Sequence, residues 1–142
     1  MILDSGFRIA ASGMSAQRTR MDVIANNIAN AETTVTPEGG PYRRRSVLFS
    51  EIASHAFGDK QKAGGVQVTG IVREMNNDKA FTRVYDPGHP QADADGWVLR
   101  PNIHVMAEMV NLMEATREYD ANVTMLNNMR QVTTKALDIG RV

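Results

Sequence analysis

The sequence predicts an α+β fold in which two long terminal helices pair as a coiled coil, with a small β-rich insert between them. Apolar residues recur at helical spacing near both ends of the chain, whereas the middle third contains short runs rich in β-formers. Pro-Gly-rich stretches separate these regions. We therefore expect an N-terminal helical segment over residues 1–32, a β-rich segment over 33–101 and a C-terminal helical segment over 102–142.

The N-terminal helix is predicted between about residues 4 and 31 from a heptad repeat. Its two columns contain Phe7, Met14, Met21 and Ile28, and Ala10, Gln17, Ile24 and Ala31. Such a repeat predicts a face that packs against another helix. Gly6 and Gly13 are expected to weaken the start of this helix.

Three asparagines in the same helix need an explanation, because asparagine is a poor helix former in the helix interior. Helical geometry places Asn26 and Asn30 opposite the heptad face and Asn27 on its flank. No charged residue occurs between residues 23 and 31, so this surface is not typical of a solvated face. We interpret the amides as contacts to further helices.

The β-rich segment follows a predicted loop, TTVTPEGGPY, at residues 33–42. Strand-like runs occur at 45–52, 66–73 and 81–85, with a shorter one at 97–99, which predicts three or four short strands. They are separated by GDKQKAGG and by DPGHPQADADG.

The C-terminal helix is predicted over about residues 102–139. Its apolar stripe contains Val105, Met109, Leu112, Thr116, Tyr119, Val123 and Leu126, and beyond these Met129, Val132, Ala136 and Ile139. At 1.5 Å per residue it would be roughly 55 Å long, which is too long for so small a chain to cover alone. It also carries Asn122, Asn127 and Asn128, and it is expected to pair with the N-terminal helix and with neighbours.

Composition narrows the function classes. The 142 residues include 16 basic and 16 acidic ones, which argues against binding nucleic acid or an anionic membrane through net charge. The absence of cysteine excludes disulfides and thiolate sites. No run of about 18 apolar residues predicts a membrane span, and the N-terminus lacks the pattern of a cleaved signal peptide.

A catalytic motif is also missing, and no cofactor site is predicted. The best metal candidate is the stretch 86–96, in which Asp86, His89, Asp93 and Asp95 could supply ligands to a metal-dependent enzyme. A long turn is the favoured interpretation, because Pro-Gly and flanking aspartates are ordinary turn formers.

The only basic cluster is formed by Arg43, Arg44 and Arg45. Without interleaved aromatic residues it favours ion pairs with a neighbouring chain, or exposure to water, over nucleic-acid binding.

The stretches SGMSAQRTRMDVIANNIANAETT and TPEGGPYRRRSVLF closely resemble the N-terminal signature of the bacterial flagellar axial proteins, which include rod and hook members. The stretch VYDPGHPQADADGWVLRPNIHVMAEMVNLMEATREYDANVTMLNNMR is similar to the C-terminal region of basal-body rod proteins of the C type, components of the proximal rod. Another rod or hook subunit is the alternative within this family.

The resemblance implies a structural, non-enzymatic subunit of the periplasmic drive shaft, exported by the flagellar type III apparatus without a cleaved signal. Its expected partners are other rod proteins, further copies of itself in a helical assembly and, as a further candidate, the basal-body rings. The terminal helices would form part of the export-channel wall and transmit torque, and we hypothesise that they are partly disordered in the free monomer.

The expected assembly interface combines both terminal helices with the basic cluster. It contains Phe7, Met14, Met21, Ile24, Asn26, Asn27, Ile28, Asn30, Arg43, Arg44, Arg45, Met109, Leu112, Tyr119, Val123, Leu126, Asn127 and Asn128.

Overall fold

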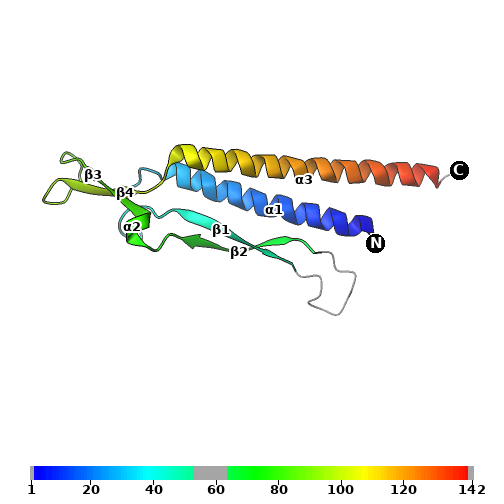
Figure 1. The fold of residues 1–142 in the computed structure, drawn as a ribbon, viewed down its shortest axis with the longest axis horizontal. Helices are drawn as coiled ribbons and strands as arrows, with labels where there is room; N and C mark the ends of the chain where they lie inside the picture. The colour runs from blue at the N-terminus through cyan, green and yellow to red at the C-terminus, as the bar shows by residue number, and fades with distance from the viewer. Residues whose placement is uncertain (1, 53–63, 141–142) are drawn as a thin grey trace.

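The computed structural model describes residues 2–52 and 64–140 (Figure 1). In chain order its elements are α1 (Ile2–Ala29), β1 (Arg45–Glu51), β2 (Val66–Arg73), α2 (Asn77–Ala80), β3 (Phe81–Tyr85), β4 (Trp97–Pro101) and α3 (Val105–Ile139). The α+β class is confirmed, with two packed terminal helices and small sheets between them in sequence. Most of the predicted linker GDKQKAGG lies outside the described residues.

The molecule is elongated, with α1 and α3 running antiparallel beside each other (Figure 1). The antiparallel hairpin of β1 and β2 lies along α1, and the antiparallel hairpin of β3 and β4 extends beyond the end of the helix pair where α3 begins. The four strands lie where their residues predicted them.

Small residues line the contact between the two helices. Ala10 and Ala115 are almost fully buried. A Cβ atom added at Gly13 would lie 3.1 Å from the amide nitrogen of Asn122, and one added at Gly6 would meet the end of the Met129 side chain. The two glycines therefore stand where α3 approaches α1 closely, and their function is packing as much as a weakened helix start.

The observed stripe on α3 is displaced from the predicted one. Glu108 and Ala115 are buried, whereas Met109 is 47% exposed and Thr116 is exposed too, so the predicted pairing through Met109 is wrong. The physical reason is that Glu108 is held inside the structure by polar partners. Because one residue turns a helix by about 100°, burying this carboxylate rotates its neighbour Met109 outward.

Only the middle of the predicted stripe packs inward, whereas Val105, Val132, Ala136 and Ile139 are exposed. The residues that are half-buried on α3 include Leu112, Tyr119, Val123 and Leu126. On α1, Ile24 is buried, and Met21 contacts α3 because its sulfur lies 3.5 Å from the hydroxyl of Thr116. Half-buried positions on α1 also include Phe7, Met14 and Ile28.

The β1–β2 hairpin is attached to α1 at two points. Near the end where β2 begins, the Ser12 hydroxyl accepts a hydrogen bond from the Val66 amide at 3.1 Å, and at the opposite, open end the Arg45 backbone bonds to Asn27. A register shift between Leu48 and Phe49 leaves both side chains substantially exposed. The hairpin thus covers one side of α1 and turns apolar residues outward.

One short element was not predicted. Helix α2 begins after Asn76, whose side chain accepts a hydrogen bond from the Asp78 amide at 3.0 Å. The sequence Asn-Asn-Asp-Lys carries this signal, because asparagine is a favoured N-cap and an acidic residue stabilises the first turn.

Helix α3 extends beyond its partner. Gly6 lies against Met129, so residues 134–139 continue past the first turn of α1 (Figure 1). Leu137 and Ile139 in this extension are largely exposed. Within the described part of the chain, no helix is both long and apolar enough to cross a membrane.

Candidate assembly interface

A buried polar cluster joins three segments of the chain: α1, residues 42–45 and α3. We call it the Asn27 network, and it consists of Asn27, Tyr42, Arg44, Arg45 and Glu108. The Asn27 side chain is 0% exposed, and its amide nitrogen donates to the Arg45 carbonyl at 2.8 Å and to Glu108 Oε2 at 3.1 Å. Its oxygen accepts from the Tyr42 hydroxyl at 3.1 Å and from the Arg45 amide at 3.0 Å. All four hydrogen-bonding positions of this amide are therefore occupied.

The carboxylate of the network is paired as well as buried. Glu108 is 3% exposed, and both Nε and Nη2 of Arg44 lie 2.8 Å from its Oε1 atom. A buried charge is tolerated when it is paired and its remaining lone pairs accept hydrogen bonds. Arg44 forms the ion pair with Glu108, and Asn27 donates the hydrogen bond to its other carboxylate oxygen. Burial also raises the pKa of Tyr42, so its hydroxyl remains a donor at neutral pH.

The predicted role of Asn27 on the flank of the helix is therefore only half right. Its amide does contact another helix, but this helix is α3 of the same chain. Its neighbours behave differently. Asn26 is exposed and Asn30 half-buried, and their amides donate to the backbone carbonyls four residues earlier, at 2.8 and 2.9 Å. Asparagine is accepted in this helix because each amide has a defined hydrogen-bond partner.

The basic cluster has partners within its own chain, whereas the sequence favoured either a neighbouring chain or exposure to water. Arg43 donates to the carbonyl of Glu74 at 3.0 Å and to the side chain of Asn77 at 2.7 Å, and its guanidinium lies over the ring of Phe81. Arg44 forms an ion pair with Glu108. The Arg45 guanidinium lies over Tyr42, 5.5 Å from the ring centre.

Several predicted interface residues meet in one surface groove. Asn26, Asn30, Arg43 and Arg45 line it together with the loop at 36–41. At the edge of this groove Glu38 forms an exposed ion pair with Arg73, whose hydrogen bond lowers the pKa of that carboxyl. The groove offers both amide and guanidinium groups to a neighbour.

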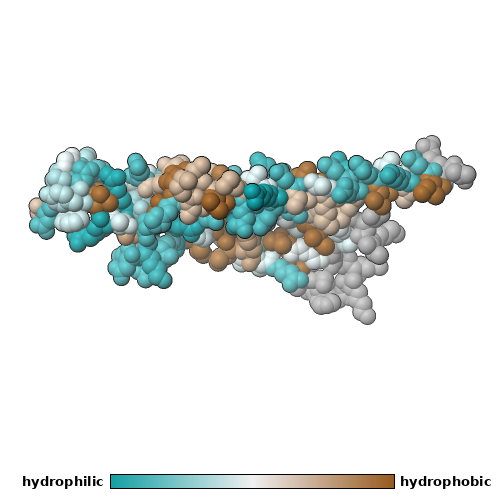
Figure 2. Space-filling view, turned by 45° about the horizontal axis from the view of Figure 1, so that its top comes forward, coloured by the Kyte–Doolittle hydropathy of each residue, from teal (hydrophilic) through white to brown (hydrophobic). Residues whose placement is uncertain are grey.

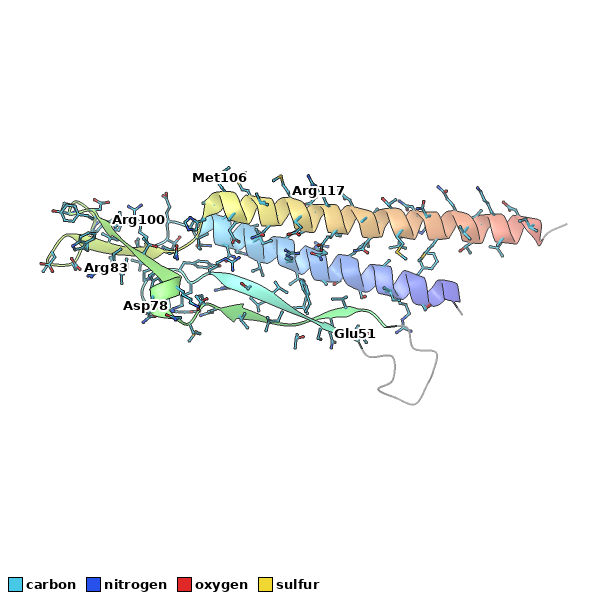
Figure 3. The ribbon with its side chains drawn as sticks, in the orientation of Figure 1. Glu51, Asp78, Arg83, Arg100, Met106 and Arg117 are labelled. Atoms are coloured by element: carbon cyan, nitrogen blue, oxygen red, sulfur yellow. The ribbon has the colours of Figure 1, made fainter. Side chains whose placement is uncertain are left out.

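The outward face of α3 carries a second apolar surface. Met106 is 75% exposed, and Met109, Val110 and Met113 beside it are about half exposed or more. Met106 points away from α1 (Figure 3), and Figure 2 shows hydrophobic residues on the outward face near the beginning of α3 and again near its C-terminal end. Farther along, Asn127 and Asn128 are exposed, and a shallow groove is lined by residues that include Met125, Asn128 and Val132.

The loop at 86–96 is a structured turn, which was the favoured interpretation of its sequence. Asp93 accepts hydrogen bonds from the amides of Asp95 and Trp97, and Asp86 pairs with Arg100 at 3.4 Å. Nδ1 of His89 accepts from the amide two residues later. Among the described residues, no three acidic or histidine side chains are placed to hold a metal ion.

Gly96 closes this turn with a φ of +81°, where a Cβ atom would lie 3.0 Å from the Tyr85 ring. Tyr85 and Trp97 pack edge to face beside it, with their ring centres 5.4 Å apart.

We expect the order of this loop to depend on pH through Asp93. The amide of Trp97, the largest contributor, lowers the pKa of this carboxyl. Because folding lowers the pKa, the carboxylate stabilises the loop above the ordinary aspartate pKa, and this contribution is lost as the pH falls through the lowered value. An NMR titration should show Asp93 titrating below the ordinary aspartate pKa, with the Trp97 amide shifting in parallel.

Two substitutions of Asp93 separate the role of its charge from the role of its hydrogen bonds. Asp93→Asn should keep the turn and abolish its pH dependence, whereas Asp93→Ala should loosen the Trp97 amide. An ordinary Asp93 pKa, or an unchanged Trp97 amide in Asp93→Ala, would contradict this account of the loop.

Comparison with known proteins bears on both helices. The family described as "Flagella basal body rod protein" matches residues 7–35, and "Flagellar basal body rod FlgEFG protein C-terminal" matches residues 94–139. The chain is 40% identical to the flagellar basal-body rod protein FlgC of Salmonella typhimurium over 141 residues, which cover 99% of this chain and 100% of that protein. The chain belongs to the flagellar basal-body rod protein family.

Similarity extends across distant bacteria. The FlgC protein of Bacillus subtilis is 41% identical over 94% of this chain and 95% of its own length, and that of Borreliella burgdorferi is 37% identical over 98% of each. The chain is therefore a structural subunit of the basal-body rod and not an enzyme. The two matched segments contain Asn27 and Glu108, one at each end of the network.

Proposed function

We propose that the chain is a subunit of the proximal rod, in which its terminal helices pair as a coiled coil and form part of the wall of the export channel. In this arrangement the β1–β2 hairpin covers the helix pair from outside. The similarity to rod proteins along the whole chain supports the assignment. The heptad spacing on both helices supports the coiled coil.

The observation that carries this proposal is the second apolar face of α3. A helix needs one apolar stripe to pack against one partner, yet α3 packs against α1 and also exposes Met106, Val110 and Met113. Larger exposed apolar surfaces typically mark contacts between proteins. Neighbouring rod subunits, including further copies of this chain, are the partners that a rod protein offers for this surface.

Torque would then pass through many lateral contacts at once, with stiffness arising from their number. A single exposed polar contact is worth no more than about 1 kcal/mol. The exposed amides of Asn26, Asn127 and Asn128 are proposed to bind adjacent subunits in the same way. Export through the flagellar type III apparatus, without a cleaved signal, would place the subunit in the periplasmic rod, where the basal-body rings are a further candidate partner.

Deletion of the gene, with its neighbours left intact, tests this function. Electron microscopy of purified basal bodies should show membrane rings without a completed rod, hook or filament, and the cells should be non-motile. Complementation with the intact gene is the control, and the chain should be detectable in purified hook-basal bodies. Complete basal bodies in motile deletion cells would refute the proposal.

We also propose that the terminal helices are partly disordered in the free monomer and become ordered on assembly. The outward face of α3 has no covering element among the described residues, and the two helices are joined through residues 30–104. Hydrogen exchange on the monomer should show weak protection in α1 and α3 compared with the assembled rod. Strong protection from Phe7 to Ala31 in the monomer would refute this idea.

A further inference from the structure

The contact between α1 and α3 repeats every seven residues on both helices. The facing columns contain Gly6, Gly13, Arg20 and Asn27 on α1, and Met129, Asn122, Ala115 and Glu108 on α3. Three pairs of direct neighbours define the alignment: Gly6 with Met129, Gly13 with Asn122, and Asn27 with Glu108. Each step of seven residues back along α1 is matched by seven forward along α3, so the register is constant over the whole contact.

Because the contact repeats so regularly, the shapes of the packed side chains alone do not fix how α3 is aligned along α1. If α3 slid by one heptad, Gly13 would face either the flexible Met129 or the small Ala115. Neither side chain creates an obvious clash against a glycine. Apolar packing in a heptad repeat is nearly equivalent in registers that differ by seven residues, and a polar residue in the contact commonly selects one of them.

The Asn27 network provides such a selection. After a slide that brings Ala115 opposite Asn27, the amide would lose its acceptor and Glu108 would lose its buried donors. The ion pair of Arg20 with Glu114 also spans the helices at 3.3 Å, but the Glu114 side chain is 58% exposed. Exposed pairs contribute little, so the buried carboxylate is the main discriminating group.

Arg44 adds to this discrimination because of where the hairpin is attached. The backbone of Arg45 bonds to Asn27, which fixes the beginning of β1 on α1. Arg44 and Asn27 therefore form one donor pair on the α1 side of the contact, and α3 supplies the single carboxylate that fits it.

We propose that Asn27, Arg44 and Glu108 determine the register of α3 against α1. The donor pair accepts the carboxylate in the observed alignment. A slide by one heptad brings either Ala115 opposite Asn27 or Glu108 opposite the partly exposed Arg20, and in both cases the donor pair loses its carboxylate. This role concerns specificity within the subunit and does not depend on where in the rod the subunit lies.

Engineered disulfides can measure the register, because the chain has no cysteine of its own. Gly13→Cys with Asn122→Cys reports the observed register, since a Cβ atom at Gly13 would lie 3.4 Å from the Asn122 Cγ atom. Gly13→Cys with Met129→Cys reports a slide by one heptad, and Gly13→Cys with Ala115→Cys a slide in the opposite direction. Each pair is oxidised in the purified full-length chain, and the intramolecular disulfide is quantified.

The first variant is Arg44→Met with Glu108→Met, which removes both charges together so that neither is left unpaired. We expect the helical circular-dichroism signal to remain and the slid disulfides to increase about tenfold or more, as expected for loss of a charge-assisted hydrogen bond. Asn26→Ala, next to the network but outside it, should leave the disulfide pattern unchanged. An unchanged single register in the double variant would overturn the proposal.

A second variant moves the carboxylate by one heptad, through Glu108→Ala with Ala115→Glu, in an Arg20→Met background because Arg20 faces position 115 in the observed register. The new carboxylate can meet Asn27 only if α3 slides, so the Met129→Cys disulfide should become the major product. Persistence of the Asn122→Cys disulfide as the major product would overturn the proposal, even where the first variant loses helical structure. Loss of helical structure in both variants would overturn it as well, because the network would then supply stability without selecting a register.

Discussion

Asn27→Ala should destabilise the subunit by about 3–5 kcal/mol, the range expected when a buried network loses a member and leaves a charge underpaired. Truncation removes the acceptor of the Tyr42 hydroxyl and of the Arg45 amide, and a donor to Glu108. None of these groups gains water in exchange without opening the contact between α1 and α3. Because a domain is typically stable by only about 5–15 kcal/mol, the loss is a large fraction of the total.

Asn26→Ala is the matched control for this prediction. It removes the same side chain one position earlier, where the residue is exposed and its amide bonds only to the carbonyl of its own helix. Alanine is the better helix former, so the control should be neutral or slightly stabilising. Thermal or urea unfolding followed by circular dichroism compares the two variants. Equal unfolding midpoints would show that the buried hydrogen bonds contribute nothing net to stability.

Local patterns predicted the secondary structure because the signals for it lie within a few residues. The strand-like runs at 66–73 and 81–85 became β2 and β3 with the same bounds. The Pro-Gly-rich loop at 33–42 contains Gly39 and Gly40, both with positive φ, as turn chemistry requires. Likewise, the favoured turn at 86–96 rests on aspartates and glycine within that turn.

The interior role of Asn27 could not be predicted in this way. Its partners Arg45 and Glu108 are 18 and 81 residues away in sequence, and a helical wheel of α1 contains neither of them. The same omission displaced the predicted stripe on α3, because the stripe was drawn from apolar spacing and did not include Glu108. A carboxylate in an otherwise apolar helix stripe is buried only where hydrogen-bond donors are positioned to bind it. Here those donors belong to α1 and to the segment before β1.

The small residues of the helix contact illustrate the opposite case, in which the signal was visible but given the wrong meaning. Gly6 and Gly13 are seven residues apart in the same repeat as Asn27. Their spacing indicates close approach of a second helix, whereas propensity alone indicates a weak helix. Both statements are physically correct, and the structure shows that the packing contribution has a defined partner at each site.

Gly13→Leu should therefore force the helices apart. The new side chain would begin 3.1 Å from the Asn122 amide and would need space that α3 occupies. Overpacking of this kind costs typically about 1–3 kcal/mol, and the gain in helix propensity, about 1 kcal/mol, offsets only part of it. We expect a lower melting temperature for the subunit and impaired motility when the variant replaces the native gene.

Ala11→Leu is the control, because it adds a leucine to the same helix at an exposed position two residues away. It should leave the melting temperature almost unchanged. If Gly13→Leu is as stable and as motile as this control, α3 can move away from α1 without penalty, and the close contact at Gly13 is not needed for the rod. If only the Gly13 variant loses stability and motility, the spacing of the helix pair is itself a requirement for assembly, because a leucine is then tolerated at exposed position 11 and not where α3 lies.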